Sequence, residues 1–584
     1  MTGPVRLARF AVPGYALALT ALVLGPLAAP GYLLLRDAVS TPRSWLPDSA
    51  LGLGGTAPRA VPQDFAIAAL SAVIDGGMLV KALLAAGLLA AGWGAGRLAG
   101  LLLPESGTPG QLVAVTLAIW NPYVAERLLQ GHWSLLLGYG CLPWVAAAVL
   151  RLRAGEQTGG QSGDWAALVF FTALAGLTPT GVILAAIVAL VCVTAPGTGV
   201  GRLRCAIAAA AIALLTAGPW LLASALGGTL GAPQSDGLAP FAARAEPGLA
   251  TLGSLAGLGG IWNAEAVPPS RATLFAIIGT MALLSVVAAG LPAVIRRPAA
   301  VPLLVLAAAS VLFTAAIATG PGLNALRVVV EAVPSLAVLR DGQKWVALAM
   351  PGYVLAGAGA VLTLSRVRFG THRMRPGVAA AACCAALIAV LPDLAWGVWG
   401  RVAPVHYPPG WTAVAAVVNA DPRPVATLPA DTMRRFDWVG PAPVLDPMPR
   451  WLQAEVLFTG DLQISGRTVT GEGGRARAVQ EILLAGADRQ ALERAGVGWV
   501  VLESGTPGRL GDALTGLRRL PVAYSDSDLT LYRVGADSPG ASQGARLAVT
   551  GAHLVWAALV VGGAAAMGLA HRRRQPHRRR QSGP

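Results

Sequence analysis

Residues 119–153 read IWNPYVAERLLQGHWSLLLGYGCLPWVAAAVLRLR, and three consecutive parts of this stretch decide the fold. A turn rich in polar and aromatic side chains, residues 119–133, precedes an uncharged apolar run, residues 134–150, and an arginine cluster, residues 151–153, follows it. A helix of about 20 apolar residues crosses a bilayer core, and arginine collects on the cytoplasmic side. The stretch therefore predicts a membrane span between an outer turn and a cytoplasmic cluster.

The whole chain has the composition of a membrane protein. Of its 584 residues, 55% are hydrophobic and 12% are charged, whereas soluble domains carry about 25% charged residues. The net charge of +15 comes from short basic clusters between apolar runs, which is the positive-inside pattern and not that of a nucleic-acid surface. We therefore expect a lipid bilayer and no nucleic acid as partner, with the basic tail at 571–580 touching anionic lipid.

Twelve apolar segments account for the membrane region. The segment 165–196 is too long for one helix across a core of about 30 Å, and Pro179 and Gly181 divide it into two short spans. With two spans there, the arginine clusters at 151–153 and 202–204 fall on the same side. An even number of spans puts both termini in the cytoplasm. The twelve segments are 12–35, 77–103, 111–130, 134–150, the two halves of 165–196, 205–226, 272–294, 300–319, 346–364, 377–399 and 547–570.

Three regions follow from this division. Residues 1–399 form a transmembrane domain of about eleven spans, residues 400–545 an extracytoplasmic α/β domain, and residues 546–584 the last span and a basic cytoplasmic tail. The middle region is more polar and has strand patterns at 424–429 and 497–504, a hairpin pattern at 520–534, and helical patterns at 411–419 and 475–495. The predicted fold class is mainly α: a polytopic membrane bundle of about twelve spans with a C-terminal α/β domain, in the plasma membrane.

The first candidate site lies where the first span leaves the membrane, at Arg36 and Asp37. A carboxylate there accepts a proton from a sugar hydroxyl, and an arginine beside it holds a phosphate. An interfacial ion pair that ends a helix is the alternative interpretation. The loop that follows contains an apolar segment with polar breaks, residues 65–75, which predicts an amphipathic helix on the outer surface.

The second candidate site is the turn between the third and fourth spans. Glu126, Gln130 and Trp133 have the spacing of one helical face, and Pro122 predicts a kink where the span leaves the bilayer. An aromatic belt with charges that reach the membrane surface is the alternative. The density of different polar groups favours a binding site, which also includes Asn121, Arg127 and His132.

The third candidate site is the outer-loop sequence PSLAVLRDGQKW, residues 334–345. Two cations, Arg340 and Lys344, lie close to Asp341 and are suited to a phosphate or pyrophosphate, although a loop ion-pair cluster explains them as well. The chain contains no Walker loop, GxSxG elbow or HExxH motif, and its five cysteines lack metal-ligand spacing. These absences argue against ATP-driven, serine-hydrolase and zinc-protease chemistry.

The arrangement resembles the GT-C superfamily of integral membrane glycosyltransferases, which use polyprenyl-phosphate sugars. The resemblance covers roughly residues 1–400. It rests on about a dozen spans, an acid after the first span (Asp37), a surface helix in the first loop, an acid in the second outer turn (Glu126) and a C-terminal outer domain. The stretch NPYVAERLLQGHW, residues 121–133, is also similar to actinobacterial cell-envelope arabinofuranosyl- and mannosyltransferases.

The resemblance implies an enzyme that transfers a sugar from a polyprenyl-phosphate donor to a glycan or lipid acceptor at the outer face. Asp37 and Glu126 are then the catalytic acids, and Arg36, Arg340 or Lys344 bind the donor phosphate. No nucleotide cofactor is needed, and a divalent metal ion on the acids is an open alternative. The paired acids that some members have in the first loop are absent here, because Asp37 follows Arg36.

Two non-enzymatic classes remain as alternatives: an envelope-assembly scaffold with a partner-binding domain, and a transporter. Transporters bury ionisable residues near the middle of the membrane in broken helices. In this chain, acids within spans are nearly absent and polar residues collect at the outer rim. This distribution favours chemistry at the outer face over conduction.

Overall fold

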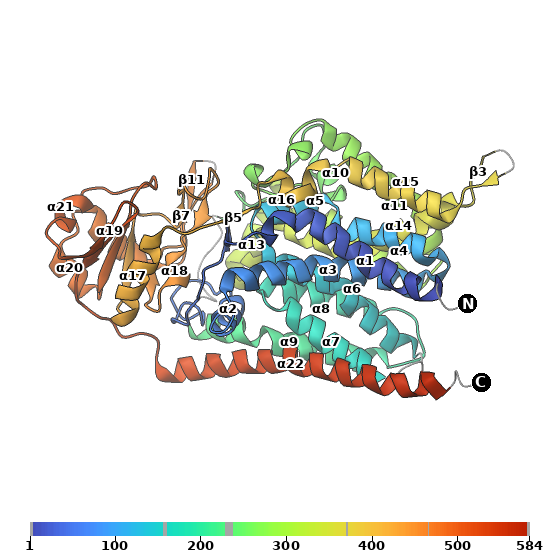
Figure 1. The fold of residues 1–584 in the computed structure, drawn as a ribbon, viewed down its shortest axis with the longest axis horizontal. Helices are drawn as coiled ribbons and strands as arrows, with labels where there is room; N and C mark the ends of the chain where they lie inside the picture. Colours follow the sequence, from blue (N-terminus) through green and yellow to red (C-terminus); the bar gives the residue numbers. More distant parts are fainter. Residues whose placement is uncertain (1–3, 156–160, 228–236, 370–371, 465, 581–584) are drawn as a thin grey trace.

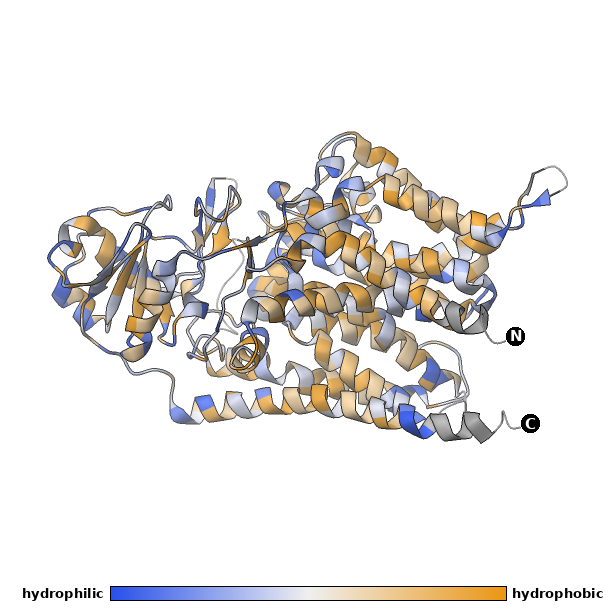
Figure 2. Cartoon of the chain, viewed as in Figure 1, coloured by the Kyte–Doolittle hydropathy of each residue, from blue (hydrophilic) through white to orange (hydrophobic). Residues whose placement is uncertain are grey.

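The computed structural model describes residues 4–155, 161–227, 237–369, 372–464 and 466–580. A bundle of long helices occupies one end of the molecule, and an α/β region occupies the other (Figure 1). The first and last helices, α1 (Pro4–Leu24) and α22 (Gln543–Arg580), both have their terminal ends at the far end of the bundle from the α/β region. Apolar residues dominate the bundle helices (Figure 2), so the chain is a multi-pass membrane protein.

In the part of the chain that the structure describes, eight helical segments are long and apolar enough to cross a membrane, and two bent helix pairs raise this number to ten. Two further helices, α7 and α8, occupy the divided segment 165–196 and have 15 residues each. Each of the twelve predicted segments thus coincides with a helix or a bent pair. The remaining bundle helices are α3 (Gly76–Leu102), α4 (Gly107–Ile119), α5 (Pro122–Leu129), α6 (Trp133–Ala154), α7 (Gln161–Ala175), α8 (Pro179–Val193), α9 (Arg202–Leu226), α11 (Phe275–Ile295), α12 (Val301–Ile317) with α13 (Gly320–Ala332), α14 (Met350–Leu364), and α15 (Pro376–Ala389) with α16 (Ala395–Trp399).

The centre of the bundle is formed by α4, α5 and α6, which are almost wholly enclosed, while α22 and α9 are largely exposed at its periphery. Small residues permit close approach between helices within the bundle. A Cβ on Gly140 of α6 would meet the carbonyl oxygen of Gly87 on α3 at 2.1 Å, so the two backbones touch only because both residues are glycine. Packing through small residues is the usual way for membrane helices to associate.

The first apolar run ends earlier than its composition predicts. Helix α1 and a short 3₁₀ turn, Gly25–Ala28, form the span, and residues 32–35 are strand β1 (Tyr32–Leu35). Strand β1 lies between β2 (Ala38–Val39) and β5 (Pro404–Val405) in a small antiparallel sheet. Arg36 and Asp37 therefore occupy a strand-to-strand turn and do not end a helix. The predicted surface helix is α2 (Gln63–Leu70), which is shorter than expected.

The third predicted span is broken before its C-terminal end. Helix α4 stops at Ile119, and Asn121 caps the next helix, α5, by accepting a hydrogen bond from the backbone N–H of Val124 at 3.0 Å. Helix α5 ends at Leu129, and α6 starts only at Trp133. The prediction that Glu126, Gln130 and Trp133 share one helical face is therefore wrong, because a tight turn separates Trp133 from α5.

The α/β region contains a five-stranded sheet in the order β13-β14-β12-β6-β9. Strands β6, β12, β13 and β14 and the helices that pack on the sheet fall on the predicted patterns, whereas β9 was not predicted. Helix α17 (Pro409–Ala420) packs on one face of the sheet, and α19 (Gly474–Leu484) and α20 (Arg489–Arg494) pack on the other. The strands are β6 (Val425–Leu428), β9 (Val456–Leu457), β12 (Trp499–Glu503), β13 (Val522–Ser525) and β14 (Leu529–Arg533). Strands β12, β6 and β9 are parallel neighbours, so their carboxyl ends lie at one edge.

Candidate functional site

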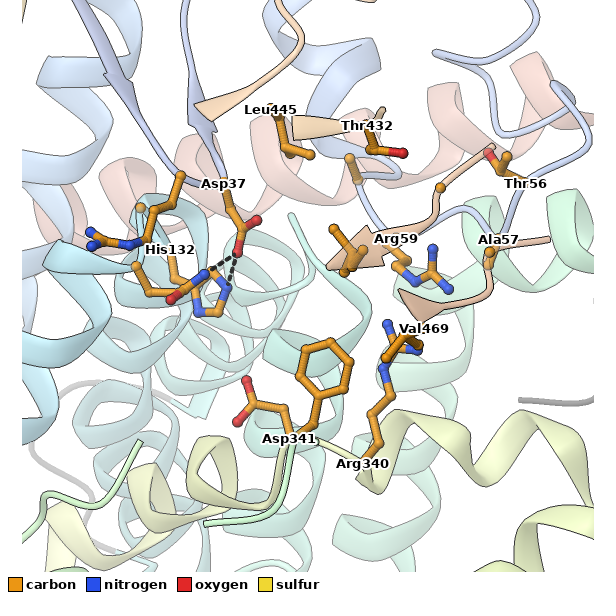
Figure 3. Close-up of a pocket in the computed structure, with 18 of the residues that line it drawn as sticks. Asp37, Thr56, Ala57, Arg59, His132, Arg340, Asp341, Thr432, Leu445 and Val469 are labelled. Carbon is orange, nitrogen blue, oxygen red and sulfur yellow. Dashed lines mark hydrogen bonds and ion pairs between the residues drawn. The ribbon is translucent and has the colours of Figure 1, made fainter. Parts of the chain in front are cut away.

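A cavity of about 1620 Å³ lies where the helix bundle meets the α/β region. Its walls come from the loop before α3, the α5–α6 turn, the segment after α9, the loop before α14, and the loops of the α/β region. Figure 3 shows Asp37 and His132 on one side of this cavity, with Arg59 and Arg340 on the other. The three sequence stretches singled out as candidate sites thus meet in one place.

Asp37 reaches the cavity because its turn rests on the α5–α6 turn. Its backbone N–H donates to the carbonyl oxygen of Gln130 at 3.2 Å. Gly131 has a φ of +82°, and a Cβ there would meet the carbonyl oxygen of Leu35 at 2.3 Å and the nitrogen of Ala38 at 2.4 Å. Glycine is therefore needed at 131 both for its backbone conformation and to let the Asp37 turn approach.

The carboxylate of Asp37 is held through one of its oxygens. Oδ2 accepts hydrogen bonds from Nε2 of His132 at 2.8 Å and from Nε2 of Gln130 at 3.0 Å. The amide of Gln130 is itself oriented, because its oxygen accepts a hydrogen bond from Asn263 at 2.8 Å. Oδ1 of Asp37 accepts no hydrogen bond from the described residues, and the side chain is 36% exposed. This leaves one carboxylate oxygen free to accept a proton.

His132 has its ring fixed from both sides. Nη1 of Arg127 lies 3.0 Å from Nδ1, and arginine is only a donor, so Nδ1 accepts and Nε2 carries the proton that it donates to Asp37. Burial lowers the pKa of His132, and the hydrogen bond and negative charge of Asp37 oppose this shift without overcoming it. His132 is consequently a neutral donor that orients Asp37.

Arg127 joins this turn to the loop before α14. Its guanidinium donates to both oxygens of Asp341, at 2.8 and 3.0 Å, and to the side-chain oxygen of Gln343. Arg127 has no exposed surface. Lys344 lies 3.7 Å from Asp341 and lines the cavity. The second and third candidate sites therefore form one hydrogen-bonded unit.

Two of the aspartates that line the cavity, Asp37 and Asp341, are held in the charged form. Burial would raise the pKa of Asp37, but the hydrogen bonds from His132 and Gln130 and the positive charge of Lys344 lower it below its usual value. Burial would likewise raise the pKa of Asp341, but the charges of Arg127 and Lys344 hold it well below its usual value. Asp37 is therefore a carboxylate at neutral pH.

The opposite wall of the cavity is cationic. Arg340 lies over the ring of Phe241, 4.6 Å from its centre, and burial lowers its pKa to about 10, so it stays charged at neutral pH. Arg340 has no ion pair with any described residue. Arg59 also lines this wall but forms an ion pair with Glu472. Sequence reasoning missed Arg59, because one arginine in a long polar loop has no distinguishing pattern.

Arg36 lines the cavity, but most of its donors are bound by the protein itself. Its guanidinium donates to the backbone oxygens of Leu129 at 2.6 Å and Glu265 at 2.9 Å, and the residue is only 3% exposed. Its donors thus hold two loops together. Asn121 is buried as a helix cap, and Trp133 is nearly buried although it lines the cavity. The polar turn predicted as a binding site is therefore partly a structural support.

Glu126 does not line the cavity with Asp37 and has no exposed surface. Its carboxylate accepts hydrogen bonds from the backbone N–H groups of Gly260 and Ile261, both at 3.1 Å, and from Nε2 of Gln343 at 3.0 Å. The expectation that Glu126 faces the same cavity as Asp37 is wrong. Its carboxylate instead fixes the loop that supplies Asn263.

The donor set is a poor fit to a resident metal ion. Across the described residues, no group of three or more histidine, cysteine, aspartate or glutamate side chains converges on one point. Both ring nitrogens of His132 are engaged, and Asp341 is bound by Arg127. We therefore derive no step through a metal.

Comparison with known proteins finds similarity in structure alone. Neither a protein-family model nor a curated protein matches the sequence. The cryo-EM structure of the arabinofuranosyltransferase AftD from Mycobacteria superposes with a TM-score of 0.57 at 17% identity, over 92% of this chain and 40% of that one. A mutant of AftD gives a TM-score of 0.55 at 17% identity, over 91% and 42%.

This chain thus spans about 40% of the length of these structures. The predicted GT-C-like fold is confirmed, since the superposition on this arabinofuranosyltransferase covers nearly the whole chain. The chain is a multi-pass membrane protein whose helix bundle and α/β region have the GT-C-like fold seen in this part of mycobacterial AftD.

Proposed function

We propose that the protein is a GT-C-type membrane glycosyltransferase that transfers a sugar from a polyprenyl-phosphate donor to a cell-envelope glycan or lipid acceptor. The observation that carries the proposal is the Asp37 carboxylate, oriented by His132 and Gln130 and open to a large cavity through one oxygen. The likeness to an arabinofuranosyltransferase supports the same class of reaction.

Asp37 acts as the general base. An acceptor hydroxyl donates its proton to Oδ1 of Asp37, and its oxygen attacks the anomeric carbon of the donor sugar. The bond between this carbon and the phosphate oxygen breaks, and the lipid phosphate leaves with the electron pair. A base held in its charged form and correctly oriented contributes about 10²- to 10⁴-fold to such a transfer.

Arg340 and Lys344 bind the departing phosphate. Both line the cavity, and both act on Asp37 through their charge. Cations near a leaving phosphate stabilise the charge that develops on it. Because the lipid phosphate is already a good leaving group when neutralised, the reaction needs no nucleotide.

The reaction takes place at the outer face of the plasma membrane. The terminal ends of α1 and α22 lie at the opposite end of the bundle from the cavity, and the basic hairpin β3–β4 (Arg368–Phe369 and His372–Arg373) lies at their end (Figure 1). Basic residues favour the cytoplasmic side. This arrangement supports cytoplasmic termini and an extracytoplasmic cavity.

Asp37→Asn tests the proposal, because it keeps the shape of the side chain and removes the proton acceptor. We expect the transfer rate from polyprenyl-phosphate arabinose or mannose to fall by about 10²-fold or more. The matched control is Asp437→Asn, an exposed aspartate away from the cavity. A correctly inserted Asp37→Asn variant with the normal rate would refute the base assignment. A wild-type protein without transfer activity would favour the envelope-assembly scaffold.

A further inference from the structure

The edge of the α/β sheet at which its parallel strands end faces the cavity. Strands β6, β9 and β12 are parallel and end at the same edge. The loop after each of them, residues 429–433, 458–461 and 504–509, contributes to the cavity wall. In open α/β sheets, ligands bind outside the carboxyl ends of parallel strands. The α/β region therefore presents the edge where such folds hold ligands.

A second pocket, of about 240 Å³, lies at this edge. Its lining comes entirely from the α/β region: Ala430, Asp431, Thr459, Asp461, Gln463, Gln480, Gly508 and Arg509. Three of these residues, Asp431, Gln463 and Gly508, also line the large cavity. The small pocket is thus a side chamber of the cavity, on the wall away from the membrane helices.

Gln480 is an unpartnered polar side chain in this pocket. It lies on the otherwise apolar buried face of α19 and is only 8% exposed. Its amide makes no hydrogen bond to any described residue, whereas most buried polar groups in proteins are hydrogen-bonded. An amide with two donors and one acceptor in a pocket is suited to a ligand that offers hydroxyl groups.

The charges around the pocket favour a neutral ligand. Asp461 is neutralised by an ion pair with Arg477, at 2.6 Å. The remaining charged side chains in the lining, Asp431 and Arg509, have opposite signs. Oδ1 of Asp431 is occupied by the backbone N–H groups of Thr432 and Met433. An anion such as phosphate would therefore meet no net positive charge.

We propose that this pocket binds a sugar unit of the acceptor, so that the acceptor carries a glycan chain. The inference rests on the proposed function and extends it by naming the acceptor class. A glycan bound at the sheet edge would extend through the shared opening toward Asp37. Gln480 would donate to and accept from the hydroxyls of that sugar unit.

Binding measured without a donor tests the proposal separately from catalysis. The full chain in lipid nanodiscs is titrated with a linear arabinofuranose hexasaccharide, a linear mannopyranose hexasaccharide, and the methyl glycoside of each monosaccharide. We expect one hexasaccharide to bind more than about tenfold tighter than its monosaccharide. Methionine is similar in size to glutamine. Gln480→Met should therefore weaken the binding of that hexasaccharide by about three- to tenfold, as the loss of one hydrogen bond predicts.

Gln490→Met is the matched control, since Gln490 is exposed on α20 and lies outside the pocket. It should leave binding unchanged. Gln480→Met should keep its thermal stability, because the amide that it removes has no partner to lose. With a donor present, it should raise KM for the hexasaccharide and leave kcat unchanged.

Three results would overturn the proposal: equal hexasaccharide affinity for Gln480→Met and wild type, no binding of either hexasaccharide, or displacement of the bound hexasaccharide by inorganic phosphate. A protein that transfers sugar normally while Gln480→Met binds like wild type refutes only this site. Loss of the Asp37 dependence with retained hexasaccharide binding refutes only the catalytic assignment.

Discussion

Arg127 in the helix bundle and Arg434 in the α/β region are two buried arginines with opposite consequences. Both have almost no exposed surface, and each is bound by side chains far along the chain. Arg434 binds Glu503 and donates to Asp446 at 3.0 Å and to Oγ1 of Thr427 at 3.1 Å. By composition, the two clusters look alike.

The difference lies in where each cluster ends. The Arg127 cluster continues through His132 to Asp37, whose free oxygen faces the cavity. The Arg434 cluster reaches the cavity only through Asp446, whose Oδ2 is bound by Arg434 and which is 6% exposed, and Glu503 at its centre is 1% exposed. A buried ion pair is weak evidence for stability or function by itself. A cluster of buried ion pairs can act on a ligand when it ends on a group that is exposed to the cavity.

Replacement of each arginine should have the largest effect on stability and should separate the two clusters by kcat. Arg127→Met and Arg434→Met both take the bound arginine from buried carboxylates, although Asp341 keeps Lys344 at 3.7 Å, so each should destabilise the protein by about 3–5 kcal/mol. For folded protein, we expect kcat to fall by up to about tenfold in Arg127→Met, because His132 loses its fixed tautomer, and to stay near normal in Arg434→Met. The measurements are the yield of monodisperse protein and kcat per folded molecule. Equal kcat in both variants would contradict the distinction.

Glu126→Gln tests whether Glu126 supports the loop at Gly260 and Ile261 or takes part in catalysis. An amide in place of the carboxylate brings a donor toward the N–H groups of Gly260 and Ile261, so the protein should lose about 1–3 kcal/mol of stability. Thermal inactivation in detergent checks this, with the exposed Glu331→Gln as control. A stable Glu126→Gln variant with strongly reduced kcat would return Glu126 to the catalytic machinery.

Substitutions of His132 test whether this residue orients the Asp37 carboxylate or binds the substrate. His132→Leu removes the donor to Asp37 and should lower kcat by about tenfold with KM unchanged, which corresponds to about 1.4 kcal/mol. His132→Gln places an amide donor near the position of Nε2 and should recover most of this loss. Steady-state kinetics of both variants provide the test. A structural role alone predicts no recovery of kcat by glutamine.

The two clusters should respond to pH in opposite directions. Burial and the nearby Asp446 raise the pKa of Glu503 to about 8, so the folded α/β region holds an extra proton and loses stability as pH rises from about 5 to about 8. The pKa of His132 is lowered from 6.5, so the site turn is most stable above that pH and loses stability as pH falls below it.

Hydrogen exchange of the full chain, corrected for intrinsic rates, measures both effects. Protection of β12 should fall between about pH 5 and 8 in wild type and stay constant in Glu503→Gln, whose side chain is always neutral. Protection of residues 121–133 should instead fall on acidification. A common pH trend in both regions would show that the clusters are not independent.

The membrane helices and the polar groups available to the site could be predicted from local sequence. Because burial in lipid depends on local composition, apolar length and arginine clusters identified most of the bundle helices, but not α13. Strand and turn patterns located the main elements of the α/β region for the same local reason. Asp37, His132 and Asp341 were recognised individually as unusual polar residues at the ends of spans.

Which of these residues contact one another depends on how the helices and loops pack. Asp37 meets His132 because Gly131 admits a distant turn, and Arg127 meets Asp341 across more than 200 positions of sequence. No local pattern encodes such contacts, since they depend on how the helices pack. The same packing enclosed Glu126, which the sequence could not distinguish from Asp37, because a carboxylate at a span end looks the same whether its partners are solvent or backbone N–H groups.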